Sequence, residues 1–73
     1  MNMLANELVI DLNGEPYRLP PGQTLGDLVH ALGIGHQALA LAVNREVVPR
    51  QQWGARPLVQ RDRVDIVRAI GGG

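Results

Sequence analysis

The 73-residue chain contains no Cys, no Ser, no Lys and no Phe. Because Cys is absent, neither a disulfide framework nor a thiolate metal site can stabilise the fold. Because Ser, Cys and Lys are all absent, the usual covalent nucleophiles are missing. The composition therefore argues against a self-contained hydrolase or transferase, and we expect the chain not to be an enzyme.

The sequence also lacks an excess of either charge and any long hydrophobic run. Seven acidic residues balance seven arginines, so no basic excess favours a nucleic acid or an anionic membrane. Residues 1–6 lack the charged start and apolar run of a signal peptide, and no apolar stretch approaches the roughly 20 residues that a membrane span needs. We expect a cytoplasmic protein without a nucleic-acid or membrane partner.

What the chain does contain is a high proportion of hydrophobic residues, 45%. Trp53 and Tyr17 are its only aromatic residues, so Leu, Ile, Val and Ala must form most of the core. A chain of this length makes one small domain and buries only about 60% of the surface that its unfolded form exposes.

The first third of the sequence predicts a β-hairpin. Residues 7–12 alternate between apolar and polar types, and Asn13-Gly14 follows, a pair that tolerates the positive φ angles of a tight hairpin turn. The return strand runs to Leu19 and contains Pro16, which cannot donate to a ladder, so we expect this strand to lie at a sheet edge or to carry a bulge there.

A short amphipathic helix should follow the hairpin. Thr24 and Asp27 have the spacing of a capping box. Gly33 and Gly35 supply the left-handed conformation that ends a helix. An apolar stripe at helical spacing connects these two ends: Leu25, Leu28, Val29 and Leu32.

The second half of the sequence predicts three more strands. Residues 39–43 alternate, residues 47–48 form a short strand that Pro49 ends, and residues 64–70 form the last strand. The predicted fold is α+β, a mixed sheet of four to five strands wrapped around one helix, as in the ubiquitin-like β-grasp. We place an N-terminal extension at 1–6, the β-grasp domain at 7–70 and a flexible glycine tail at 71–73.

The three glycines at the C-terminus point to a chemical use. A segment without side chains can thread a narrow cleft and present the terminal carboxylate to a nucleotide site. Adenylation of that carboxylate creates a leaving group, after which a persulfide can deliver sulfur and leave a thiocarboxylate. The general alternative is a frayed end without function. The absence of Lys fits the first interpretation, because an activated acyl terminus would meet no ε-amine on its own chain.

Several segments make the chain similar to the ThiS family, the sulfur carriers of thiamine thiazole synthesis, over residues 8–73. The matching segments are the Asn13-Gly14 turn, residues 22–25, residues 40–44, residues 47–50 with Trp53 close behind, and residues 66–73. Residues 1–6 are an extension relative to this pattern.

The resemblance implies a β-grasp fold and a role for each tail residue. Gly73 would be adenylated by an E1-like adenylyltransferase (ThiF type), with ATP bound by that partner and no cofactor on the chain itself. A persulfide protein would supply the sulfur, and a thiazole synthase (ThiG type) would accept it. Gly71 and Gly72 would be the flexible positions that let Gly73 extend into the active sites of these partners.

Three other functions remain open from the sequence. The chain has the features of a carrier for another pathway, such as the small subunit of molybdopterin synthase, which shares the fold and the chemistry. A ubiquitin-like protein tag would instead form amide bonds with targets. A structural β-grasp module would not need its terminal glycines.

The outward face of the third and last strands is the predicted docking surface. If the larger apolar residues of these strands point toward the helix, small apolar groups point away from it, and such groups on an exposed face commonly mark a partner site. The predicted docking residues are Ala40, Ala42, Val67 and Ala69. The alternative is a face that is apolar only because of strand propensity.

Four more residues have structural explanations. His30 and His36 lack acidic or cysteine partners at ligand spacing, so we expect solvated side chains and no metal site. Trp53 should be buried in the core. Arg50 is either a partner contact or pairs with a nearby acid in its loop.

Overall fold

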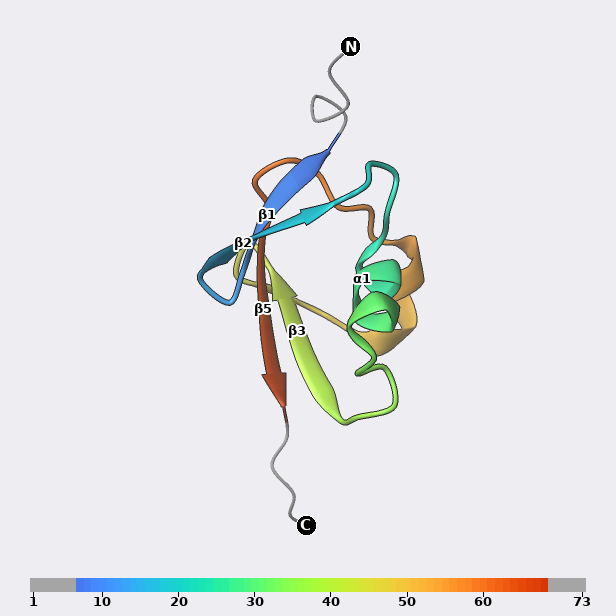
Figure 1. Cartoon of the computed structure of the whole chain (residues 1–73). Coiled ribbons are helices and arrows are strands. Elements are labelled where there is room, and N and C mark those ends of the chain that lie inside the picture. Colours follow the sequence, from blue (N-terminus) through green and yellow to red (C-terminus); the bar gives the residue numbers. More distant parts are fainter. Residues whose placement is uncertain (1–6, 69–73) are drawn as a thin grey trace.

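The structure, a computed structural model, describes residues 7–68 (Figure 1). The elements follow one another along the chain as β1 (Leu8–Leu12), β2 (Glu15–Leu19), α1 (Leu25–Leu32), β3 (Leu39–Val43), β4 (Glu46–Val48), the 3-10 helix η2 (Arg50–Ala55) and β5 (Arg63–Arg68). No helix within this range is long and apolar enough to cross a membrane.

The five strands form one mixed sheet in the order β2-β1-β5-β3-β4. The first and last strands, β1 and β5, pair in parallel at the centre, while the other neighbours are antiparallel. The predicted β-grasp arrangement is confirmed, with five strands. Pro16 lies in β2, at one edge, as its missing N–H group requires.

Both hairpin turns rest on residues with positive φ. Asn13 (φ 50°) and Gly14 (φ 89°) join β1 to β2, which confirms the predicted turn. Asn44 (φ 52°) and Arg45 (φ 73°) join β3 to β4 in the same manner, although Arg45 has a side chain that disfavours this conformation. The position of each turn fixes the register of its hairpin.

The helix begins and ends as the sequence predicts. The Thr24 hydroxyl accepts the Asp27 N–H at 3.1 Å, and the Asp27 carboxylate accepts the Thr24 N–H at 2.9 Å. Gly33 ends α1 in the left-handed conformation, with φ 72°, whereas Gly35 does not take a positive φ. These bonds satisfy backbone groups that the short helix cannot pair internally.

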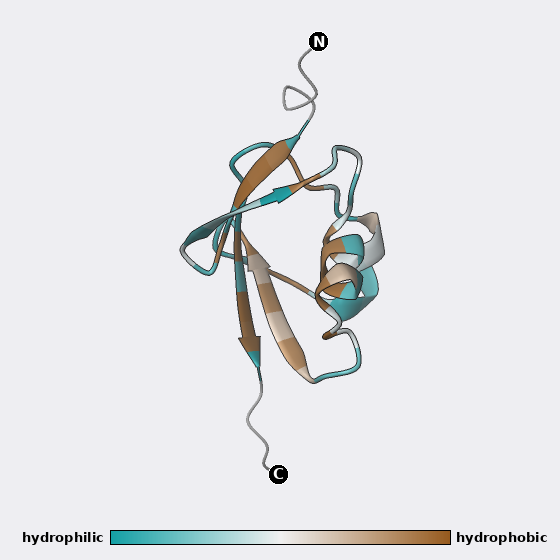
Figure 2. Cartoon of the chain, viewed as in Figure 1, coloured by the Kyte–Doolittle hydropathy of each residue, from teal (hydrophilic) through white to brown (hydrophobic). Residues whose placement is uncertain are grey.

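The core lies between the helix and one face of the sheet (Figure 2). Trp53, on η2, is buried and donates its Nε1–H to the Val48 carbonyl at 2.8 Å, so its predicted place in the core is confirmed. Helix and 3-10 helix meet at Gly26, where a Cβ atom would lie 3.3 Å from the Gly54 backbone. The most completely buried side chains come from both layers: Ile10, Leu25, Leu28, Leu41, Val43 and Val64.

Candidate functional site: the last strand and its outer face

The predicted acyl site, Gly73, lies five residues after Arg68, the last residue of β5. This strand lies between β1 and β3 and is described as far as Arg68. The other predicted tail and docking residues, Ala69 and residues 71–73, lie outside the described residues, as does the expected continuation of the strand to residue 70. The structure therefore shows the base from which the tail continues.

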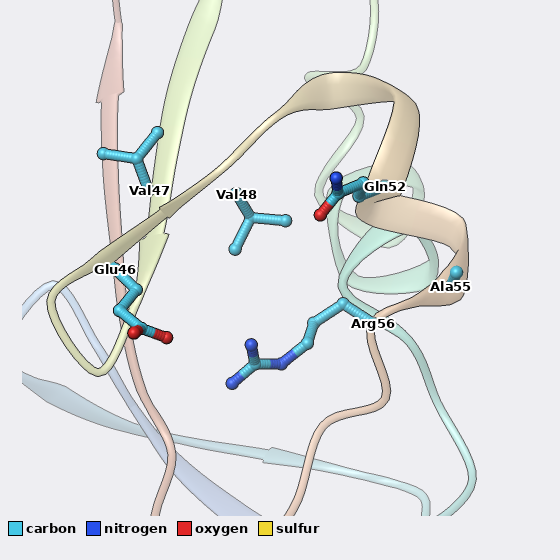
Figure 3. A pocket seen from close by; sticks show the side chains of 6 residues that line it. All are labelled: Glu46, Val47, Val48, Gln52, Ala55 and Arg56. Carbon is cyan, nitrogen blue, oxygen red and sulfur yellow. The ribbon is translucent and has the colours of Figure 1, made fainter.

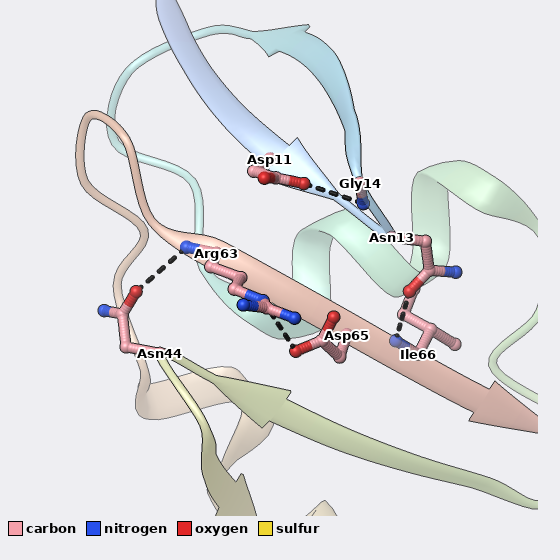
Figure 4. A network of polar contacts seen from close by, with 7 residues as sticks. All are labelled: Asp11, Asn13, Gly14, Asn44, Arg63, Asp65 and Ile66. Atoms are coloured by element: carbon pink, nitrogen blue, oxygen red, sulfur yellow. Dashed lines mark hydrogen bonds and ion pairs between the residues drawn. The ribbon is translucent and has the colours of Figure 1, made fainter.

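Two asparagines hold β5 from opposite sides (Figure 4). On the β1 side, the Asn13 N–H donates to the Val64 carbonyl at 2.9 Å, and the Asn13 Oδ1 accepts the Ile66 N–H at 2.7 Å. The second bond lets a side chain continue the ladder where the chain has already turned away into β2.

On the β3 side, Asn44 contacts β5 in a similar way. Its N–H donates to the Arg63 carbonyl at 2.7 Å, and its Oδ1 accepts the Arg63 N–H at 3.0 Å. The sequence predicted Asn13 as a turn residue but missed the bonds of both asparagines to the last strand. Asparagine is suited to both roles because it tolerates positive φ and carries a short amide.

A buried carboxylate braces the loop before β5. Asp62 is only 4% exposed and accepts hydrogen bonds from the Val59 N–H at 2.9 Å and from Asn44 Nδ2 at 3.0 Å. This residue was missed from the sequence. Its position in a turn just before a strand was the only available signal, because Asn44 approaches it only in the folded chain.

The outer face of the sheet bears the predicted small apolar residues. Ala40 pairs with Val67 across β3 and β5, and Ala42 pairs with Val47 across β3 and β4. Ala40 is exposed, Ala42 is half-buried and Val67 is 62% exposed, so their outward orientation is confirmed. Figure 2 shows that β3 carries no hydrophilic residue on either face.

The structure adds Val47 to this face, where it is 75% exposed. A three-residue strand is too short to show an alternation, so the sequence did not assign its side chains to faces. We call Ala40, Ala42, Val47 and Val67 the outer patch. The Arg63–Asp65 ion pair, at 3.2 Å, lies on β5, the strand that also carries Val67 (Figure 4).

The expectation that Arg50 pairs with an acid is wrong. Its guanidinium donates to two backbone carbonyls, from Nη1 to Gly35 at 3.0 Å and from Nη2 to Gln37 at 2.7 Å. It also lies 4.4 Å from the centre of the Trp53 ring. Carbonyls of the loop after α1 take the place of a carboxylate because no acidic residue occurs between Asp27 and Glu46.

The described residues do not form a metal centre. Both histidines, His30 and His36, are exposed, as predicted. Across residues 7–68, no three His, Cys, Asp or Glu side chains are grouped so that they could hold a metal ion. What the described part of the chain offers is the strand β5, held by hydrogen bonds from both hairpin turns, and the apolar outer patch.

The model of the ThiS family matches residues 10–73, which is most of the chain and includes its terminal glycines. The chain belongs to the ThiS family. The predicted resemblance is thereby confirmed. A sulfur carrier protein ThiS from Escherichia coli (strain K12) is 31% identical over 61 residues, which cover 84% of this chain and 92% of that protein.

A second relative of this ThiS family member is much longer. A thiazole synthase from Magnetococcus marinus is 41% identical over 64 residues, which make up 88% of this chain but only 20% of that protein. The chain therefore spans about a fifth of this relative's length. In that protein a segment like this chain is part of a larger thiazole synthase.

Among solved structures, the fold is similar to the crystal structure of the thiamine biosynthesis protein ThiS from Geobacter metallireducens. The TM-score is 0.74 at 24% sequence identity, and the match covers 90% of this chain and all of that one. This similarity supports the β-grasp fold found above.

Proposed function

We propose that this chain is a sulfur carrier of thiamine biosynthesis that holds sulfur on its C-terminal residue, Gly73. The observation that carries the proposal is the family match, which extends through residue 73 and thus includes the glycine tail. A carrier named for the same task aligns over 92% of its own length. The chain supplies a folded base and a carboxylate, and partner enzymes supply the catalysis.

The proposed chemistry begins with an inert carboxylate. An E1-like adenylyltransferase joins the Gly73 carboxylate to AMP, and pyrophosphate leaves ATP. The terminal sulfur of a persulfide then attacks the acyl carbon and displaces AMP. A thiol reduces the resulting acyl disulfide, which leaves a thiocarboxylate on Gly73 and a disulfide on the donor side. No residue of this chain acts as a catalyst in these steps.

The proposed acceptor is a thiazole synthase. Its support is the relative from Magnetococcus marinus, in which a segment like this chain belongs to a protein named thiazole synthase. Two proteins that act on one another are often joined in a single chain, because joining raises their effective concentration. This observation favours the thiazole branch over a carrier for molybdopterin synthesis and over a protein tag.

The acceptor can be tested by sulfur transfer. The thiocarboxylate form of the chain is mixed with the cognate thiazole synthase and its other substrates, and thiazole formation is followed. We expect one thiazole per carrier, and none with the carboxylate form. Thiazole formation at the same rate from the carboxylate form would rule out this role.

The outer patch is the proposed docking surface for these enzymes, together with Ala69 at its end. Its support is the exposure of Val47 and Val67, two of the large apolar side chains that the described residues leave in solvent. Apolar side chains gathered on an exposed sheet face are typical of protein interfaces. The interface would place the end of β5 near the partner, so that five further residues reach its active site.

A further inference from the structure

We propose that the end of the domain at which β5 stops is a positively charged docking surface for the thiazole synthase. Its counterpart would be a set of carboxylates around the opening through which that enzyme receives the tail. The inference rests on the proposed function, since a tail that continues from Arg68 can enter an enzyme only if this end of the domain lies against it. We call this end the exit surface.

Two hollows flank the end of β5, one on each face of the sheet. The inner hollow, about 210 Å³, is lined by Leu12, Asn13, Leu32, Ile34, Ile66 and Arg68. The outer hollow, about 370 Å³, is lined by Ala38, Leu39, Ala40, Arg50 and Val67. Leu39 and Arg68 are partners in the β3–β5 ladder, so the hollows adjoin. Each is mainly apolar and contains one charged side chain, an arginine.

Arg50 is a cation held in place. A guanidinium has five N–H donors, and within residues 7–68 Arg50 uses two of them, on the Gly35 and Gln37 carbonyls. Stacking on Trp53 fixes the plane of the group. An ordered guanidinium with donors to spare loses little entropy when it binds a carboxylate, and the pair is strengthened by its charge.

The segment between α1 and β4, which contributes to this end of the domain, contains no acidic residue. None occurs from residue 28 to residue 45, a stretch that contains the exposed His30 and His36. The nearest acid along β5 is Asp65, which is paired with Arg63. Within residues 7–68, the two hollows of the exit surface are therefore lined by two arginines and by no carboxylate.

Hollows elsewhere on the domain differ in charge. Figure 3 shows the hollow between β4 and η2, into which both Glu46 and Arg56 project. Another, beside the first hairpin, contains Glu15, and a third contains Asp11 together with Arg61. Since the chain as a whole is neutral, a one-sign surface at the end of β5 is a local feature and points to a partner of opposite sign.

Such a surface has a kinetic consequence. Complementary charges speed the encounter of two proteins and orient them. Salt weakens this effect, because charges farther apart than the Debye length, about 10 Å at 0.1 M, are largely screened. The apolar walls of the hollows would hold side chains of the synthase once the two proteins are docked, and the arginines would pair with carboxylates at the rim.

The test compares Arg68→Glu with Arg61→Glu in binding to the cognate thiazole synthase. Both variants change the charge equally, but Arg61 precedes β5 and lies at its opposite end. At about 20 mM salt we expect Arg68→Glu to raise Kd about tenfold or more, mainly through slower association, and Arg61→Glu to change it less than about twofold. The Arg68→Glu defect should shrink toward 0.3 M salt, because the Debye length falls from about 20 Å to about 6 Å over this range.

Equal effects of the two variants, or an Arg68→Glu defect that salt does not reduce, would overturn the exit surface. Arg68→Gln serves as a second variant and should show a smaller defect than Arg68→Glu. Thermal unfolding of all three variants separates binding from folding. Failure of the proposed function looks different, because the unaltered chain would then not bind the synthase or donate sulfur at all, and the exit surface would fall with it.

Discussion

Single side chains of Asn and Asp determine how the last strand is held. Asn13 and Asn44 take positive φ angles in the two hairpin turns and also accept hydrogen bonds from Ile66 and Arg63 of β5. Asp62 then fixes Asn44 through a further bond. On its β1 side, β5 has only two paired residues, Arg63 and Val64. The Asn13 side chain extends this support as far as Ile66.

Replacing Asn13 should test this role. We expect Asn13→Ala to lower the free energy of unfolding by about 2 kcal/mol, because it loses the bond to the Ile66 N–H and puts a side chain that disfavours positive φ in the turn. Asn13→Asp keeps an acceptor oxygen and should lose less than half as much. Urea unfolding measures both, and an Asn13→Ala variant as stable as the original would contradict the role.

For single residues, the sequence predicted the environment of a side chain correctly where the residue type alone determines it. Trp53 is buried as predicted, because a large aromatic in a small domain has few other places. Arg50 could not be assigned because its two carbonyl partners lie 13 and 15 positions away along the chain, and Asp62 could not because its side-chain partner, Asn44, lies 18 positions away. Local patterns contain no information about such pairings.

At the scale of elements, α1 is a short helix that depends on its caps. Eight residues are too few for a stable isolated helix, so the capping box and the packing of its apolar stripe must hold it. The helix in turn closes the core over β3 and β5. Loss of a cap should therefore affect the stability of the whole domain.

Thr24→Ala removes the hydroxyl that accepts the Asp27 N–H. We expect it to lower the free energy of unfolding by about 1 kcal/mol, the usual cost of losing an N-cap. Thr24→Ser keeps the hydroxyl and should stay within about 0.5 kcal/mol of the original. Chemical denaturation followed by circular dichroism gives both values; equal losses in the two variants would argue against the cap.

The elements themselves could be predicted where periodicity or turn chemistry is strong. The Asn13-Gly14 hairpin, the capped helix and the strand at 39–43 are found as expected. The parallel pairing of β1 with β5 could not be derived from periodicity, because these strands lie far apart in the sequence. The face of Val47 was not predictable, since β4 is three residues long.

At the scale of the whole molecule, one sheet face packs on the helix and the other bears the outer patch. If that patch contacts partner enzymes, removing one apolar side chain from it should weaken binding without unfolding the domain. Val67→Gln does so without adding charge. We expect about a tenfold higher Kd for the activating enzyme, which corresponds to about 1.4 kcal/mol.

Val59→Gln is the matched control, because Val59 is 56% exposed and lies outside the patch. It should leave Kd within about twofold, and both variants should unfold within about 1 kcal/mol of the original, because both side chains are largely exposed. Isothermal titration calorimetry provides the comparison. Indistinguishable Kd values for the two variants would exclude Val67 from the interface.

The most direct test of the carrier function is the intact mass of the protein. The chain is incubated with ATP, a persulfide sulfur donor and the cognate activating enzyme, alongside a variant that lacks Gly72 and Gly73. We predict that the full chain becomes heavier by the difference between one sulfur and one oxygen atom, that fragmentation places this change on Gly73, and that the shortened chain keeps its mass. A full chain that still ends in an ordinary carboxylate would contradict the account.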